Sequence, residues 1–336
     1  MLVLGIESSC DETAAAVLKD GSEVLSSIIS DQINIHSKYG GVVPELAGRC
    51  HAEAIHLVIE EALDKAGVIL EQIDLIAVTK GPGLVTSLLV GLNTAKAMAY
   101  ALKKPLIDVN HLEGHLLAIF LQENVKFSFI ALTVSGGHTE LYRVDDFGKY
   151  KILGQTRDDA AGECFDKVAK MLKLGYPGGP VIEKKAQLGN PSAYRFPRAF
   201  LEKGSLDFSF SGLKTSVRNI IAKREDKNGP NLTDEDISAS FQESVIEVLT
   251  TKLIIATKKE DLKRVVVTGG VAANKALRER VIIECKKHGL EASFPKPVYC
   301  TDNAAMIACA GYYKYRKNHP SFTNTLNLDA SSMLRL

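Results

Sequence analysis

The sequence predicts a protein of mixed α/β class with two lobes, and three observations support this prediction. The chain has 336 residues, more than most single domains, so two lobes with separate cores are expected. Strand-like and helix-like segments alternate over the first hundred residues, as they do in α/β lobes. Residues 129–144 repeat the pattern of residues 3–18, which indicates that the second half begins in the same way as the first.

The first lobe is predicted from its apolar patterns. The segments LVLGIE, TAAAVLKD and SEVLSSIIS have the composition of strands and are separated by short polar turns. A helix is predicted over 44–66, where apolar residues recur at helical spacing. The strand DLIAVT, the turn KGPG and a helix over 84–102 follow.

The second half starts with FIALTVSGGHTELYRV (129–144), two strands around a glycine-rich turn. It repeats the design of VLGIESSCDETAAAVL (3–18), in pattern more than in identity. Two such hairpins facing each other would present backbone N–H groups to one anionic ligand. Taken alone, SGGH is also compatible with an ordinary hairpin turn.

Two further glycine clusters follow. In RVVVTGGVAANKALRER (264–280) a strand leads through a double glycine into a helix, which allows a flat or phosphorylated ligand to approach the backbone. The sequence lacks GxGxxG and GxxxxGK[ST], which argues against a Rossmann dinucleotide site and a P-loop ATPase. YPGGPVIEKKA (176–186) predicts a turn before a short helix.

The segment NHLEGH places His111 and His115 one helical turn apart. This spacing suits a pair of metal ligands, but also two core histidines on one helix face. Gly114 favours the first interpretation, because a glycine inside a helix costs about 1 kcal/mol and indicates a close approach to the backbone. In HExxH metalloproteases the Glu directly follows the first His, whereas Glu113 lies two positions on, about 200° around the helix. Spacing alone does not decide between ligands and core residues.

Composition places the chain among soluble proteins, with 46% apolar and 24% charged residues. The N-terminus is not basic, and no apolar run approaches the roughly 18 residues that cross a bilayer. We therefore expect a cytoplasmic protein without membrane association. The six cysteines are far apart and form no CxxC pair, so free thiols are expected, with Cys10 and Cys164 as packing residues.

Charge is unevenly distributed along the chain. The net charge is only +1, but residues 184–227 contain ten Lys or Arg against four acids. This basic segment predicts either a local patch for a polyanion or a solvated insertion rimmed by lysines.

Ten motifs together resemble the universal tRNA N6-adenosine threonylcarbamoyltransferase family, in its bacterial branch. They cover nearly the whole chain in order: GIESSCDET (5–13), GGVVPELAGRCH (40–51), GPGL (81–84), NHLEGH (110–115), VSGGHTEL (134–141), AGECFDK (161–167), YPGGP (176–180), FSFSGLKT (208–215), GGVAAN (269–274) and CTDNAAM (300–306).

The resemblance implies a fold of the actin, Hsp70 and sugar-kinase type, with two ribonuclease-H-like lobes around a nucleotide cleft. The first lobe is expected over 1–128, joined by the C-terminal segment 305–336. The second is expected over 129–304, with the basic insertion near 184–227.

The resemblance also implies the reaction, which is transfer of a threonylcarbamoyl group from threonylcarbamoyl-AMP to N6 of adenosine 37 in tRNAs reading codons that begin with A. One divalent metal ion, Fe(II) or Zn(II), would act as a Lewis acid. The implied partners are tRNA, an inactive paralogous subunit and a small P-loop ATPase, with a separate enzyme that makes the adenylate. A nucleotide-binding metalloprotease and a kinase-like module are the alternatives.

Site residues follow from the matching motifs. The resemblance implies that the metal ligands, which are also the catalytic residues, are His111, His115 and Asp302. It implies that the adenylate contacts Val134, Ser135, Gly136, Gly137, His138, Asp166, Gly179, Glu183 and Asn274. Glu183 departs from the family pattern, in which many members have Asp at this position.

Overall fold

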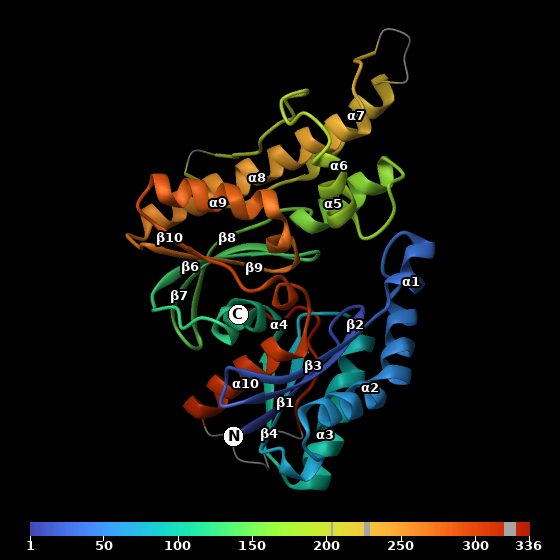
Figure 1. The fold of residues 1–336 in the computed structure, drawn as a ribbon, viewed down its shortest axis with the longest axis vertical. Coiled ribbons are helices and arrows are strands. Elements are labelled where there is room, and N and C mark those ends of the chain that lie inside the picture. Colours follow the sequence, from blue (N-terminus) through green and yellow to red (C-terminus); the bar gives the residue numbers. More distant parts are fainter. Residues whose placement is uncertain (203, 225–228, 319–326) are drawn as a thin grey trace. The chain divides into compact units, whose positions relative to one another are not determined.

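The computed structural model shows two compact units (Figure 1). The first comprises Met1–Val125 and Val298–Leu336, and the second Lys126–Pro297. Each unit is built on a five-stranded sheet with helices, so the predicted α/β class is confirmed. The residues described are 1–202, 204–224, 229–318 and 327–336.

The unit boundary differs from the sequence prediction at one functionally relevant place. Residues 298–304 were expected in the second lobe, but they belong to the first unit. The reason is that they lead directly into a helix that packs on the first sheet, α10 (Ala304–Asn318). Asp302 therefore belongs to the same unit as His111 and His115.

The first sheet has the strand order β3-β2-β1-β4-β5. Its strands are β1 (Leu2–Glu7), β2 (Glu12–Lys19), β3 (Glu23–Asp31), β4 (Leu75–Gly81) and β5 (Leu106–Asn110). Strand β1 is antiparallel to β2 and parallel to β4, and β4 is parallel to β5. The carboxyl ends of β1, β4 and β5 thus meet at one edge, the usual position for a ligand site in such sheets.

The helices of this unit are α1 (Ile33–His36), α2 (Pro44–Ala66), α3 (Val85–Leu102), α4 (His111–Leu117) and α10. Helix α2 begins with a proline, whose fixed φ suits the first helical position, and ends at Gly67 in the left-handed conformation. The predicted helices over 44–66 and 84–102 are confirmed by α2 and α3.

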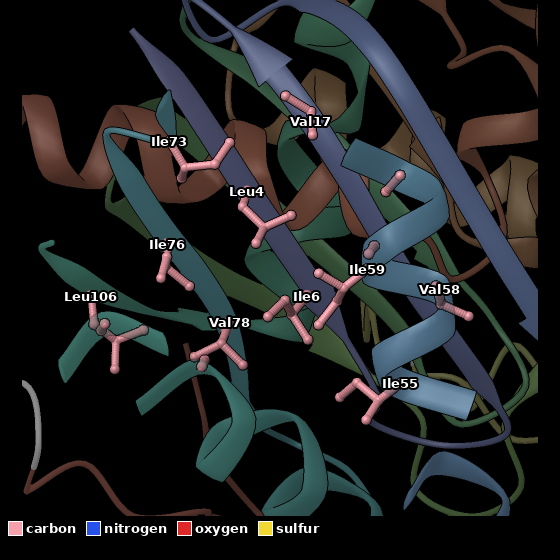
Figure 2. Close-up of a cluster of buried hydrophobic side chains, with 14 of the residues drawn as sticks. Leu4, Ile6, Val17, Ile55, Val58, Ile59, Ile73, Ile76, Val78 and Leu106 are labelled. Carbon is pink, nitrogen blue, oxygen red and sulfur yellow. The ribbon is translucent and has the colours of Figure 1, made fainter. Parts of the chain in front are cut away.

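The apolar core of the first unit lies between its sheet and helices α2 and α3 (Figure 2). Leu4 and Ile6 of β1 belong to this cluster together with Ile55 and Ile59 of α2, and Ile6 lies beside Ile59. Alternate residues of a strand face opposite sides, so Gly5 faces the other side of the sheet. There α10 packs closely, because a Cβ on Gly5 would lie 2.2 Å from the Ala304 carbonyl oxygen.

The second sheet has the order β10-β9-β6-β7-β8. Its strands are β6 (Phe129–Val134), β7 (Thr139–Asp146), β8 (Lys149–Gln155), β9 (Arg264–Thr268) and β10 (Glu291–Ser293). Its helices are α5 (Ala161–Met171), α6 (Gly178–Ala186), α7 (Ser211–Arg224), α8 (Asp234–Lys259) and α9 (Lys275–Lys287). Helix α8 packs against β6, β9, α6 and α9.

The two sheets share one topology. In both, three antiparallel strands are followed by two parallel strands added at the side of the first. The internal repeat predicted between residues 3–18 and 129–144 is confirmed by the hairpins β1-β2 and β6-β7. The six cysteines are free, as predicted. Among the described residues, no helix is long and apolar enough to cross a membrane.

Candidate active site

The two histidines lie on the short helix α4, which starts directly after β5. Asn110 caps this helix, because its side-chain oxygen accepts a hydrogen bond from the Leu112 amide at 2.8 Å. His111 is the first residue of α4 and His115 follows one turn later on the same face. Helix α10 accounts for Gly114, since a Cβ there would lie 2.9 Å from Ile307 Cδ1. The close approach inferred from this glycine is thus helix packing.

Asp302 completes a group of three potential metal ligands. Its Oδ1 lies 3.1 Å from His115 Nε2 and 3.5 Å from His111 Nε2. The ligand atoms of the three residues all lie within 4.8 Å of one another. His115 is fully buried, His111 is nearly so, and the Asp302 side chain is 21% exposed. Two imidazole nitrogens and one carboxylate oxygen form a donor set that suits Fe(II) or Zn(II).

Asp302 is held at the start of α10 by its neighbour. The Asn303 side chain accepts a hydrogen bond from the Met306 amide at 2.9 Å and donates one to the Thr301 carbonyl at 2.8 Å. Asn303 is completely buried, so the chain direction before α10 is fixed. The Asp302 carboxylate can therefore reach α4 without rearrangement of the backbone.

A second carboxylate, Glu7 at the end of β1, lies on the other side of the His111 ring. Its Oε2 is 3.0 Å from His111 Nδ1. Burial opposes ionisation of both acids, but the imidazoles overcome it and lower the pKa of Glu7 and, more strongly, of Asp302. Burial also opposes the charged form of His111, yet the two carboxylates raise its pKa well above the ordinary value. The site thus favours positive charge.

Sequence reasoning missed Glu7 and also His51 of α2. The His51 Nε2 donates to the Cys10 carbonyl at 2.9 Å, and its Nδ1 accepts from the Thr13 hydroxyl at 2.7 Å in that tautomer. His51 is fully buried and supports the turn between β1 and β2. Glu7 could have been found because it is a charged residue at the end of an apolar strand. His51 could have been found because it ends the family motif GGVVPELAGRCH (40–51).

In the second unit, the turn SGGH connects β6 and β7. The Ser135 amide donates to the His138 carbonyl at 2.8 Å, and the Ser135 carbonyl accepts from the Gly162 amide of α5 at 3.1 Å. Gly136 and Gly137 are exposed. Within the described part of the chain, neither glycine amide donates an intramolecular hydrogen bond. The turn therefore offers two adjacent backbone donors to a ligand.

The glycines of this region fall into two groups. A Cβ on Gly162 would lie 2.5 Å from the Ser135 carbonyl oxygen, and one on Gly178 would lie 2.4 Å from the Asp166 Cα. These two are required by packing. A Cβ on Gly136, Gly137 or Gly179 would meet no atom within 4 Å, and none of the three has positive φ. Packing within the protein does not explain this second group.

Other predicted adenylate contacts already have partners within the protein. Asp166 Oδ1 accepts from the Gly178 amide at 2.6 Å, which fixes the turn before α6. Glu183 Oε1 accepts from the Lys275 amide at 2.8 Å, at the start of α9.

Asn274 caps α9 by accepting from the Leu277 amide at 2.9 Å, and its side-chain amide donates to Gln242 Oε1 at 2.7 Å. Val134 is buried at the end of β6. Helix α5 contacts both the SGGH turn and helix α6. The residues that hold these helices therefore form a connected framework next to the turn.

The basic segment is partly neutralised by acids from elsewhere in the chain. Four of its cations form ion pairs: Lys185 with Glu235, Arg198 with Glu247, Lys214 with Asp159 and Arg224 with Asp234. Four others are exposed, namely Lys184, Arg195, Arg218 and Lys223. Lys203 and Lys227 lie outside the described residues. The patch available for a polyanion is thus smaller than the sequence count indicates.

The sequence of this chain is similar to the sequences of one protein family. The sequence model of the family "tRNA N6-adenosine threonylcarbamoyltransferase" matches residues 23–309. A protein of that name from Clostridioides difficile (strain 630) is 53% identical over 337 residues, covering 100% of this chain and 98% of the relative. One from Geobacter sp. (strain M21) is 55% identical over 313 residues, covering 93% and 91%.

Solved structures with lower identity show the same fold. Full-length HypF in its phosphate- and nucleotide-bound form superposes with a TM-score of 0.63 at 14% identity, over 96% of this chain and 47% of HypF. Component A of the (R)-2-hydroxyglutaryl-CoA dehydratase of Acidaminococcus fermentans gives a TM-score of 0.56 at 18% identity, over 95% and 100%. The solved structures support the fold, and the relatives that match along nearly the full length show the family. The chain belongs to the tRNA N6-adenosine threonylcarbamoyltransferase family.

Proposed function

We propose that the protein transfers the threonylcarbamoyl group of threonylcarbamoyl-AMP to N6 of adenosine 37 in tRNAs reading codons that begin with A. The observation that carries this proposal is the identity above 50% to transferases of that name along the whole chain. In the reaction, N6 forms a bond to the carbamoyl carbon, the bond from that carbon to the phosphate oxygen breaks, and N6 loses a proton as AMP leaves.

His111, His115 and Asp302 are proposed to hold one divalent metal ion. Their donor atoms lie within reach of a single ion, and His111 and His115 are buried in a unit with a well-packed core. When bound, the ion would supply Lewis acidity toward a carbonyl or phosphate oxygen. The residues themselves fix the position of that positive charge, because α4 and α10 are both capped and packed on the sheet.

The SGGH turn is proposed to bind the phosphate of the adenylate. Its two exposed glycine amides can donate to an anion, and the bare Cα atoms let the ligand come close. The N-terminus of α5 lies next to this turn and adds a favourable dipole. Asp166, Glu183 and Asn274 then act chiefly by holding the surrounding turns, with Gly179 offering a second open approach.

The proposed partners are tRNA, a paralogous subunit and a small P-loop ATPase, in the cytoplasm. Lys184, Arg195, Arg218 and Lys223 are the proposed phosphate contacts, because these cations are exposed and the neighbouring Lys185, Arg198 and Arg224 are engaged in ion pairs.

The test is a reconstituted transfer assay with unmodified tRNA, synthetic threonylcarbamoyl-AMP and the partner subunits, followed by nucleoside mass spectrometry. Modified adenosine should appear with the wild-type protein and be absent with His115→Ala. Cleavage of protein substrates, or phosphate transfer from ATP to a small molecule, without any modified nucleoside would refute the proposal.

A further inference from the structure

A buried carboxylate outside the proposed ligand set lies behind the metal centre. Glu7 is completely buried at the carboxyl end of β1, the central strand of the first sheet. Its Oε1 accepts from the Ser9 amide at 2.5 Å, and its Oε2 accepts from the Thr79 hydroxyl at 2.7 Å. Burying an ion costs several kcal/mol unless it is paired, so a carboxylate at this position is expected to interact with a group that stabilises its negative charge.

That partner is His111. Glu7 Oε2 lies 3.0 Å from His111 Nδ1, and an ionised carboxylate can only accept hydrogen bonds. The proton of the neutral imidazole is therefore on Nδ1, and Nε2 keeps its lone pair. Nε2 is also the atom that lies 3.5 Å from Asp302 Oδ1, and the same oxygen lies 3.1 Å from His115 Nε2. The hydrogen bond to Glu7 thus selects the tautomer and the ring orientation that a metal ligand needs.

The support of Glu7 itself is rigid. Strand β1 pairs with β2 on one side as far as Glu7, which lies opposite Ala14, and with β4 on the other side as far as Ile6. Thr79 on β4 and the Ser9 amide each hold one carboxylate oxygen. The Ser9 hydroxyl also lies 3.1 Å from His111 Nδ1. The carboxylate therefore has little freedom to turn away from the imidazole.

We infer that Glu7 is a positioning residue of the metal centre, which holds His111 with Nε2 toward the ion and increases the basicity of that nitrogen. This inference rests on the proposed metal site at His111, His115 and Asp302. Partners of this kind typically contribute about 10- to 100-fold to metal affinity.

The test is a titration of the metal-free protein with Zn(II) in competition with a chromophoric chelator. Glu7→Gln keeps the shape but removes the charge and should weaken Zn(II) binding about 10- to 100-fold. Thr79→Val removes only a support of Glu7 and should have a smaller effect. His111→Ala should abolish binding at the site. Replacement of the exposed His56 by Ala is the matched control and should leave the affinity unchanged.

Two further readouts separate positioning from a purely structural role. The visible spectrum of bound Co(II) should differ between wild type and Glu7→Gln, since it reports ligand geometry. The increase in Tm on adding Zn(II) should also shrink, whereas a structural defect would lower Tm equally with and without metal. If Glu7→Gln does not fold, Glu7→Asp serves in its place, because it keeps the charge but shortens the reach to His111.

The outcomes distinguish this inference from the metal site on which it rests. If the Glu7 variant keeps the wild-type affinity and Co(II) spectrum while His111→Ala loses binding, the role of Glu7 is overturned. The metal site then still stands. Unchanged binding in His111→Ala would instead overturn the metal site itself.

Discussion

The turn between β1 and β2 and the turn between β6 and β7 occupy equivalent positions in the two sheets, but they are built in different ways. In the first turn, Ser8, Ser9 and Asp11 are buried. Its backbone is bonded within the protein, since the Ser9 carbonyl accepts from the Leu84 amide and the Ser9 amide donates to Glu7. In the second turn, Gly136 and Gly137 are exposed, and their amides donate no hydrogen bond to any other residue that the structure describes.

This difference gives the two turns surroundings that suit charges of opposite sign. Beside the first turn, buried side chains gather negative charge around imidazole nitrogens, which suits a cation. At the second turn, bare glycine amides suit an anion. The sequence predicted that both turns offer backbone N–H groups to one anion. The first turn differs from that prediction, because the Ser9 amide is already bonded to Glu7.

The largest effect is expected at the proposed metal site, which lies beside the first turn. His115→Ala and Asp302→Ala each remove one donor from the group of three, so Zn(II) affinity should fall by more than the roughly 100-fold upper range of an outer partner. Transfer should be lost while the circular dichroism spectrum stays unchanged. Metal content measured after dialysis checks this, and a variant that retains its metal would remove that residue from the ligand set.

The next largest effect concerns the second turn. Gly137→Val places a side chain in space that the protein leaves open, so AMP binding should weaken at least tenfold while stability changes by about 0.5 kcal/mol or less. Gly162→Ala is the matched contrast. Its Cβ would press on the Ser135 carbonyl, which should cost about 1–3 kcal/mol of unfolding free energy.

Calorimetric AMP titration and urea unfolding of both glycine variants would check this prediction. If Gly137→Val bound AMP like the wild type, the anion would bind elsewhere. The difference between the two turns would then not reflect the binding of different ligands.

A smaller effect is expected for tRNA. Reversing Lys184, Arg195 and Arg218 together to Glu should reduce the slope of log affinity against log salt by roughly 2 to 3, since each phosphate contact contributes about 0.7 to 0.9. Arg198→Glu should act differently. It breaks the ion pair with Glu247 and should lower stability, with little change in the slope.

Binding of tRNA to the assembled complex at several salt concentrations provides the measurement. An unchanged slope in the triple variant would mean that the partner subunits supply the phosphate contacts.

The smallest effect concerns pH and the support of the first turn. Burial lowers the pKa of His51 below its ordinary value of 6.5, so the folded state prefers the neutral ring. Its stabilising effect is complete above pH 6.5 and is lost as the pH falls toward the folded pKa. The loss follows the direction of the pKa shift and is expected to be smaller than the effects above.

The stability difference between wild type and His51→Gln, measured by urea unfolding from pH 8 to pH 5, isolates this contribution from that of His111. The difference should change in favour of the variant as the pH falls. A constant difference would show that His51 does not titrate in this range.

Sequence patterns alone determined the features that depend on neighbours along the chain. The strands around both turns, helices α2 and α3, and the pairing of His111 with His115 all follow from periodicities of two to four residues. The repeated hairpins were visible for the same reason, because each is a local unit. Asp302 could be assigned only through the family resemblance, since 187 residues separate it from His115.

The tertiary structure alone decided which groups face one another across such distances. Glu7 meets His111 because parallel strands bring the carboxyl ends of β1 and β5 to one sheet edge, a pairing that leaves no periodic signal. Arg198 forms an ion pair with Glu247 because α8 brings that carboxylate beside it. In each case a charge acts over a few ångströms of space, and sequence separation says nothing about that distance until the chain has folded.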